Sequence, residues 1–327
     1  MSPRLSLALS DTGLELPGSE AVAVFHARAD ADLSALPKDR VVCIQPFFPD
    51  HQGLSQQGYA CVLDPPVQVD ASLICLPRAK AQARATIAAA MAITKGPVIV
   101  DGVKTDGIDS VLKAVKARVG INGVVSKAHG KLFWIEGDAD VLADWHAQPG
   151  TVDAFTTAPG VFSADGIDPA SRLLADALPE KLGRRVVDLG AGWGYLAACA
   201  LARPGIEQLD LVEADHVALE CARANVDDPR ARFHWDDAVS WKPDGRADAV
   251  LMNPPFHTGR SADPGLGRAF IGAAARLLAP SGTLWMVANR HLPYESTLGE
   301  YFAQLRDAGG DGRFKVLAAS RPSRPRR

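Results

Sequence analysis

The chain has 327 residues, which exceeds the size of one ordinary hydrophobic core, so two domains are the first expectation. Hydrophobic residues make up 47% of the sequence and charged residues 22%, which is the composition of a soluble globular protein. The formal charge of -3 excludes a protein that is basic over its whole surface, so any contact with nucleic acid has to be local.

The sequence carries no mark of secretion, of a membrane span or of a metal site. Its five cysteines form no C-x-x-C pair and are expected to be buried free thiols in a reducing cytoplasm. The apolar piece at residues 5–9 is too short for a signal peptide, and no apolar run reaches the length of a membrane span. Eight scattered histidines show no ligand spacing. We therefore expect a cytoplasmic protein without membrane or metal partners, and a monomer is favoured over an oligomer.

The first half of the chain, residues 1–150, is predicted to form one α/β domain. Short apolar pieces at residues 21–25 and 41–44 indicate strands separated by turns. From Leu73 onward the pattern predicts, in order, a strand at 73–77, a helix at 80–93, a strand at 98–100, a helix at 108–118 and a strand at 130–134.

Positive charge gathers in two places. Between Arg78 and Lys131 there are ten Lys and Arg residues against three Asp, and residues 321–327 form a basic tail. Short charge runs of this kind are more often solvated faces or disordered ends than surfaces that contact nucleic acid. If the chain binds nucleic acid, these two places are the candidates for the contact.

The second domain is predicted over residues 151–327. The boundary falls at Gln148-Pro149-Gly150, because a Pro-Gly pair beside polar residues favours an exposed turn. A helix at residues 168–178 then leads into the central strand of this domain.

A glycine-rich turn follows that central strand. The apolar pair Val186-Val187 and Asp188 precede Gly190, Gly192 and Gly194, and an Ala- and Leu-rich helix begins at Tyr195. Glycines without Cβ atoms let the backbone N–H groups and the helix N-terminus approach a ligand, which predicts a small-molecule site. The spacing is G-x-G-x-G, with Tyr195 where a dinucleotide-binding turn has its third glycine, so a nicotinamide enzyme is disfavoured. A purely structural turn is the alternative.

The next two strands add two carboxylates. The strand at residues 209–212 ends in Glu213, at the position from which such folds accept hydrogen bonds from ribose hydroxyls. The strand and exit at residues 233–238 place Asp236 and Asp237 near the adenine of a bound nucleoside, and we favour Asp237.

The strand at residues 248–252 ends in Asn253-Pro254-Pro255-Phe256. An exocyclic amino group attacks poorly because its lone pair is delocalised. Hydrogen bonds to the Asn253 side-chain oxygen and the Pro254 carbonyl would draw electron density onto the nitrogen and orient it. Pro255 would contact the substrate and Phe256 would stack on a base. His257 is expected to position the substrate rather than to act in the chemistry.

The remaining elements repeat the order of the first half, with a helix at residues 266–278, a strand at 283–287, a helix at 295–305 and a strand at 312–317. This order indicates a diverged duplication of one α/β fold, although two unrelated α/β halves could look similar. Cys75-Leu76-Pro77-Arg78 stands where the second half has Asn253 to Phe256. The first half would therefore have lost its chemistry and would bind RNA or stabilise the protein.

These motifs resemble those of class I methyltransferases, and more closely those of the ribosomal RNA guanine-N2 methyltransferases. The resemblance covers the second half and rests on Gly160-Val161-Phe162-Ser163 with Asp165, Gly166 and Asp168, on Val187 to Gly192, on Asn253 to His257, on Ala288-Asn289 with Leu292-Pro293-Tyr294, and on Gly312 to Val316. It implies two Rossmann-like methyltransferase domains in tandem, the N-terminal one degenerate and the C-terminal one catalytic. It also implies S-adenosyl-L-methionine as cofactor and the N2 amino group of a guanine in ribosomal RNA, free or in the subunit, as the acceptor, with the small subunit favoured.

The sequence departs from the family pattern at two positions and leaves other functions open. Glu213 replaces a common aspartate, and Trp193 is bulky for a glycine turn and would narrow the pocket. Asn-Pro-Pro followed by an aromatic residue also resembles adenine-N6 methyltransferases and the enzymes that methylate a glutamine amide in release factors. A silent RNA-binding or assembly protein and a nicotinamide oxidoreductase are the more distant alternatives.

Overall fold

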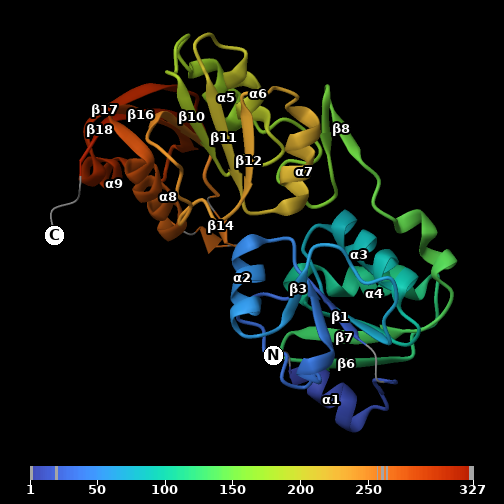
Figure 1. The fold of residues 1–327 in the computed structure, drawn as a ribbon. Coiled ribbons are helices and arrows are strands. Elements are labelled where there is room, and N and C mark those ends of the chain that lie inside the picture. Colours follow the sequence, from blue (N-terminus) through green and yellow to red (C-terminus); the bar gives the residue numbers. More distant parts are fainter. Residues whose placement is uncertain (1–2, 19–20, 256, 259–260, 263, 324–327) are drawn as a thin grey trace. The chain divides into compact units, whose positions relative to one another are not determined.

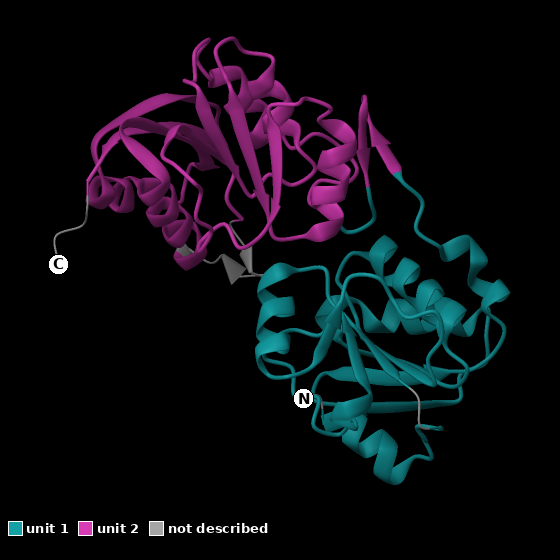
Figure 2. Cartoon of the chain, in the orientation of Figure 1, with its two compact units in different colours: residues 1–149, 158–160 teal, residues 150–157, 161–327 magenta. Residues whose placement is uncertain are grey.

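A computed structural model of the chain describes residues 3–18, 21–255, 257–258, 261–262 and 264–323. The chain divides into two compact units, coloured separately in Figure 2. The N-terminal unit comprises residues 1–149 and 158–160, and the C-terminal unit comprises residues 150–157 and 161–327.

The N-terminal unit is built on a seven-stranded sheet with the strand order β3-β2-β1-β4-β5-β7-β6 (Figure 1). Its strands β1 to β5 are parallel, and β7 runs antiparallel between β5 and β6. The elements are α1 (Pro3–Asp11), β1 (Val22–Phe25), η1 (Lys38–Arg40), β2 (Val41–Ile44), α2 (Phe48–Gln56), β3 (Ala60–Val62), β4 (Ala71–Cys75), α3 (Lys80–Ile93), β5 (Val98–Val103), η2 (Lys104–Asp106), α4 (Ile108–Lys116), β6 (Gly123–Lys127), β7 (Gly130–Ile135) and η3 (Ala139–Trp145).

The C-terminal unit contains a second seven-stranded sheet, with the order β12-β11-β10-β13-β16-β18-β17. The elements are β8 (Gly150–Val152), β9 (Phe155–Thr157), α5 (Pro169–Ala177), β10 (Arg185–Leu189), α6 (Tyr195–Leu201), β11 (Gln208–Glu213), α7 (His216–Asn225), β12 (Ala231–Trp235), β13 (Ala247–Met252), β14 (His257–Thr258), β15 (Ser261–Ala262), α8 (Pro264–Leu277), β16 (Leu278–Asn289), α9 (Tyr294–Tyr301), β17 (Phe302–Gly310) and β18 (Phe314–Pro322).

The two sheets have the same topology. The order β3-β2-β1-β4-β5-β7-β6 becomes β12-β11-β10-β13-β16-β18-β17 when each strand is replaced by its counterpart in the other unit. In both sheets the last three strands along the chain form an antiparallel edge on a parallel core. The predicted fold class, two Rossmann-like domains in tandem, is confirmed.

The central strands β10 and β13 of the C-terminal sheet are buried on both faces, which explains why they are largely continuous apolar runs. Leu174 of α5, Ala197 of α6 and Leu211 of β11 are fully buried in the core on one face. Ile271 of α8 and Leu298 of α9 are fully buried in the core on the other face. This three-layer packing leaves the carboxyl edge of the sheet as the place where loops can form a site.

The structure corrects two of the predicted elements. The helix predicted at residues 295–305 ends at Tyr301, and Phe302–Gly310 forms the edge strand β17, paired antiparallel with β18. Local helix propensity continues past Tyr301, but pairing along β18 stabilises the extended backbone instead. The third strand, predicted with its exit at residues 233–238, begins two residues earlier and comprises Ala231–Trp235, with residues 236–238 as its exit. All five cysteines are free thiols, although only Cys43 and Cys221 are fully buried.

Candidate functional site

Three neighbouring parallel strands of the C-terminal unit end in the same register. Leu189 of β10 pairs with Val212 of β11 on one side and with Met252 of β13 on the other. The residues that follow these three positions are Gly190, Glu213 and Asn253. Strand pairing therefore brings three of the predicted site residues to one edge of the sheet, although they are far apart in sequence.

The glycine turn has a backbone that only glycine adopts easily. Gly190, Gly192 and Gly194 have φ angles of 73°, 54° and 90°, all in the left-handed region. The Gly190 N–H donates to the Val212 carbonyl at 2.9 Å, which fixes the start of the turn on β11. A Cβ on Gly194 would lie 3.0 Å from Val226, whereas a Cβ on Gly192 would meet no atom within 4 Å. Gly194 thus permits close packing, and Gly192 faces the open space in front of the turn.

Glu213 ties the turn to the end of β11. Its Oε2 accepts a hydrogen bond from the Gly192 N–H at 2.8 Å, and its Oε1 accepts one from the Asp215 N–H at 2.8 Å. Each carboxylate oxygen keeps a second lone pair, so these bonds leave room for a further donor. The predicted contact of Glu213 with a ribose remains a prediction.

Asp188 is fully buried in β10, and its carboxylate oxygens receive no close hydrogen bond from the described residues, although the Ala197 N–H is a nearby backbone donor. Burial raises its pKa to about 7, the charge of Glu213 adds to the rise, and the Ala197 N–H opposes it. A buried acceptor without a donor is costly for a folded protein. It fits a ligand that carries a positively charged donor group.

A small cavity of about 40 Å³ lies in front of the turn. It is lined by the turn and by residues from α5 and the end of β13: Phe162, Ser163, Asp168, Ser171, Gly190, Ala191, Gly192, Trp193, Tyr195, Leu196 and Asn253. The Trp193 indole N–H donates to the Phe162 carbonyl at 2.9 Å, and its ring packs against Phe155 and Tyr195. Trp193 is thus held rigidly in the wall of the cavity.

The Asn253 side chain is anchored by two residues of α5. Its Nδ2 donates to Asp168 Oδ2 at 2.8 Å and to Ser171 Oγ at 2.9 Å. Because an ionised carboxylate only accepts hydrogen bonds, the Asn253 NH2 group must face Asp168, and the Oδ1 atom points the other way. Asp168 also accepts from the Ser171 N–H at 2.8 Å and so caps α5. The amide of Asn253 is therefore oriented before any substrate arrives.

The sequence places Asp168 at the start of a helix and within a family motif, but it assigns Asp168 no role beside Asn253. The only available signal is the N-cap pattern of Asp168 before Pro169. Asp168 and Asn253 are 85 positions apart in the sequence, so no local pattern reveals their contact.

The other predicted site residues are distributed differently. Pro254 is buried and Pro255 is exposed. Phe256 lies outside the described residues, and of His257 only the backbone is described, in β14 paired with β15. Asp237 accepts a hydrogen bond from the Val239 N–H at 2.9 Å, which stabilises the turn after β12, and it does not line the 40 Å³ cavity.

The same three strand ends in the N-terminal unit carry different residues. Phe25 of β1 pairs with Ile44 and Ile74, so the following positions are His26, Gln45 and Cys75. Here His26 has a φ of 57° and, like Gly190, donates its N–H to the neighbouring strand, at 3.1 Å.

Side chains of the N-terminal unit satisfy one another at these positions. The His26 ring lies 3.0 Å from Thr86 Oγ1, and burial lowers its pKa to about 4. Buried Gln45 donates to the Ala27 carbonyl at 2.6 Å and accepts from the Phe47 N–H at 2.9 Å. The place of the glycine turn is thus filled by the unit's own side chains.

The sheet topology, the glycine turn and the strand-end residues of the C-terminal unit define a Rossmann-like methyltransferase domain. Residues 153–318 match the methyltransferase small domain family. The chain belongs to this family.

Comparison with individual proteins shows similarity to ribosomal RNA methyltransferases. A ribosomal RNA large subunit methyltransferase G of Shewanella amazonensis is 32% identical over 244 residues, covering 69% of this chain and 62% of that protein. A ribosomal RNA small subunit methyltransferase C of Hahella chejuensis is 31% identical over 233 residues, covering 67% of this chain and 68% of that protein. The chain thus spans less than two thirds of the large subunit relative.

Among solved structures, this chain is similar to the 16S rRNA N2 G1207 methyltransferase of T. thermophilus in complex with AdoMet and guanosine. The TM-score is 0.78 at 27% sequence identity, over 94% of this chain and 90% of that chain.

Two further findings concern partners. Of the helices in the described part of the chain, none has the length and apolar character needed to cross a membrane. Within the same residues, no cluster of three or more His, Cys, Asp or Glu side chains is arranged to hold a metal ion.

Asp188→Asn tests whether the buried carboxyl serves a ligand rather than the fold. Folding raises the pKa of this carboxyl to about 7, so at intermediate pH it binds more protons in the folded protein than in the unfolded chain. The free energy of unfolding therefore falls as the pH rises toward 7. The variant should melt at a higher temperature than the wild type at pH 8 and lose this advantage near pH 4, as measured by thermal denaturation.

The same variant should bind S-adenosylmethionine at least ~10-fold more weakly in calorimetry, since a neutral amide lacks the charge for a cationic donor. Asp227→Asn, at an exposed carboxylate, is the matched control and should change neither the melting temperature nor the affinity for S-adenosylmethionine. A lower melting temperature for Asp188→Asn at pH 8, with unchanged cofactor affinity, would make Asp188 a structural residue.

Proposed function

We propose that the chain transfers the methyl group of S-adenosylmethionine to the exocyclic N2 amino group of a guanine in small-subunit ribosomal RNA. The observation that carries this proposal is the Asn253 amide, which is anchored through its NH2 group and lines the same cavity as Gly190 and Gly192. An acceptor oxygen beside a cofactor turn suits the capture of an amino group.

The residues present fit this cofactor. The backbone of the turn from Gly190 to Gly194 would approach it closely, Asp188 would accept from its ammonium group, and Glu213 would accept from its ribose hydroxyls. Asp237 would lie near the adenine. When bound, S-adenosylmethionine supplies a methyl group on a positively charged sulfur, which is a strong electrophile.

The acceptor nitrogen requires orientation more than it requires a base. Asn253 Oδ1 and the Pro254 carbonyl would accept its two N–H groups and leave its lone pair directed at the methyl group. Phe256 would stack on the guanine, a contact worth roughly 1–3 kcal/mol. Pro255 and His257 would hold the rest of the nucleotide. The proton can leave after transfer, so no strong general base is needed.

The choice of the small subunit is supported by coverage. The small subunit relative of Hahella chejuensis is covered over 68% of its length, and the solved 16S rRNA enzyme over 90%. The large subunit relative of Shewanella amazonensis is covered over 62%. The guanine in the solved complex also favours a purine N2 acceptor over an adenine N6 or a glutamine amide.

We further propose that the N-terminal unit binds the RNA. All three aspartates between Arg78 and Lys131 are already paired, Asp101 with Arg4, Asp106 with Arg78 and Asp109 with Lys131. The side chains of five exposed lysines of the same segment form no hydrogen bond or ion pair with any described residue: Lys80, Lys104, Lys113, Lys116 and Lys127. The pKa of Asp109 is lowered by the hydrogen bond from Lys131 and also by the charge of Lys104. Unpaired cations suit RNA phosphates.

The product is the direct test of the proposed function. Ribosomal RNA from a strain that lacks this protein should gain one N2-methylguanosine when incubated with the protein and labelled S-adenosylmethionine. Nucleoside mass spectrometry of the separated subunit RNAs should find it in the small-subunit RNA. Label in the large-subunit RNA would correct the subunit, and label in methyladenosine or in protein would refute the acceptor.

Asp168→Ala should slow methyl transfer because the Asn253 amide would no longer be held. We expect kcat to fall roughly 10- to 100-fold, with the affinity for S-adenosylmethionine within a few-fold of wild type. Loss of the helix cap should also lower the free energy of unfolding by about 1 kcal/mol.

Two controls separate orientation from capping. Asp168→Asn keeps an acceptor oxygen and should recover most of the turnover. The double variant with Asn253→Ala should be no slower than Asn253→Ala alone, since both act through one amide. If the fold-losses in kcat of the two single variants multiply in the double variant, Asp168 acts independently of Asn253.

Replacing Lys104, Lys113 and Lys116 together by alanine should weaken RNA binding. The slope of log affinity against log salt should fall by roughly 0.7–0.9 for each phosphate that is no longer neutralised. Fluorescence anisotropy with a small-subunit RNA transcript measures both the affinity and its salt dependence. Lys38→Ala is the control, because this lysine lies outside the segment and donates to the Gln57 carbonyl at 2.6 Å. An unchanged slope in the triple variant would place the RNA surface elsewhere.

A further inference from the structure

The connection between β12 and β13, residues 236–246, contains no helix. On that face of the C-terminal sheet, α8 lies over β13 and β16, and the side toward β11 and β12 is covered mainly by Trp241 of the connection. A cavity of about 220 Å³ opens there, at the amino ends of the strands. It lies at the opposite edge of the sheet from Gly190 and Asn253.

The rim of this cavity is cationic. It includes Arg185 from β10, Arg232 from β12, and Lys242 and Arg246 from the connection. The side chains of Arg185, Arg232 and Lys242 are exposed and form no hydrogen bond or ion pair with any described residue. Arg246 donates to the Arg276 carbonyl. Three of the four cations therefore remain available to a ligand.

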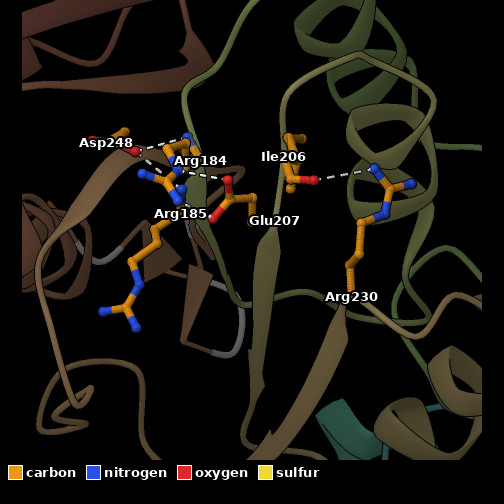
Figure 3. Close-up of polar contacts among 6 residues, drawn as sticks. All are labelled: Arg184, Arg185, Ile206, Glu207, Arg230 and Asp248. Atoms are coloured by element: carbon orange, nitrogen blue, oxygen red, sulfur yellow. Dashed lines mark hydrogen bonds and ion pairs between the residues drawn. The ribbon is translucent and has the colours of Figure 1, made fainter.

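Figure 3 shows how Arg185 differs from its neighbours. Arg184 forms a two-point ion pair with Glu207, at 2.6 Å for each bond, and Arg230 donates to the Ile206 carbonyl at 3.3 Å. The guanidinium of Arg185 extends away from these pairs, and only its backbone N–H contacts Asp248, at 3.0 Å.

The chain makes room for this guanidinium. A Cβ added to Gly245 would meet Arg185 Nη1, so the guanidinium lies against the backbone of the connection where glycine leaves space. The arginine therefore lies beside the cavity without a counter-ion among the described residues.

Two carboxylates, Asp210 and Asp244, line the cavity against its four cations. Asp210 is buried, and both of its oxygens are occupied, Oδ1 by His234 Nε2 at 2.8 Å and Oδ2 by Gln208 Nε2 at 2.7 Å. Asp244 is exposed at the rim. The four cations thus surround a cavity whose buried carboxylate, Asp210, already accepts two hydrogen bonds.

We propose that this cavity binds a phosphate group, and that in the complex it holds a phosphodiester of the RNA substrate away from the reacting guanine. Converging guanidinium and ammonium groups suit an oxyanion of this size. A strand of six residues such as β11 spans roughly 20 Å, so the RNA would contact both edges of the sheet only if it extends several nucleotides beyond its target. The RNA part of this inference rests on the proposed function, and the phosphate part does not.

The test compares Arg185→Ala and the double variant Arg232→Ala/Lys242→Ala with the wild-type protein. Affinity for a small-subunit RNA transcript should fall about 3- to 10-fold, and the salt slope should fall by roughly 0.7–0.9 for each phosphate left without its cation. The affinity for S-adenosylmethionine should not change. Lys181→Ala removes an exposed cation outside the cavity and serves as the control.

A second arm titrates inorganic phosphate and follows thermal stability at constant ionic strength. Phosphate should stabilise the wild type and Lys181→Ala but not the cavity variants, and it should compete with the RNA. Stabilisation without any effect of the variants on RNA affinity would overturn the RNA assignment in favour of a free phosphate. If the cavity variants match the wild type both in RNA affinity and in stabilisation by phosphate, the cavity does not bind phosphate.

This outcome is separable from that of the proposed function. A protein that produces no N2-methylguanosine but loses RNA affinity through Arg232 and Lys242 would refute the reaction and retain the phosphate site.

Discussion

The structure depends on the register of three parallel strands. Backbone hydrogen bonds hold Leu189 level with Val212 and Met252, so Gly190, Glu213 and Asn253 must emerge together at one edge of the sheet. A shift by one residue would turn every side chain of a strand to the opposite face and would bury polar groups in the two cores. Core packing therefore fixes the positions of these predicted site residues.

The two units show what this framework permits. Both sheets have the same strand order, and both end their central strands in the same register. In one unit these ends carry a glycine turn and a buried Asp188 that receives no close hydrogen bond from the part of the chain that the structure describes; in the other, His26 and Gln45 satisfy their own hydrogen bonds. Buried groups without hydrogen bonds lower stability, so the C-terminal unit retains at Asp188 a cost that the N-terminal unit avoids at these positions.

The carboxyl and amino ends of the strands in the C-terminal sheet present different chemical groups. The carboxyl edge presents oriented acceptors, because α5 fixes the Asn253 amide through Asp168 and Ser171. The amino edge presents unpaired cations, because the short connection 236–246 leaves part of one face without a helix. Oriented acceptors suit a reacting amino group, as the proposed function requires, and unpaired cations suit phosphate, as the proposed phosphate site requires.

The sequence by itself determined the class of fold and most of the residues at the carboxyl edge. Glycine spacing, apolar strands of fixed length and Asn253-Pro254-Pro255 are local patterns, and each reflects a local constraint on backbone or side chain. Only the tertiary structure decided the partners of those residues. The anchoring of Asn253 by Asp168 joins positions 85 residues apart, β17 forms only because β18 offers an edge to pair with, and the cavity at Arg185 exists because a helix is missing from one face. These features arise from contacts between distant segments, which no local pattern encodes.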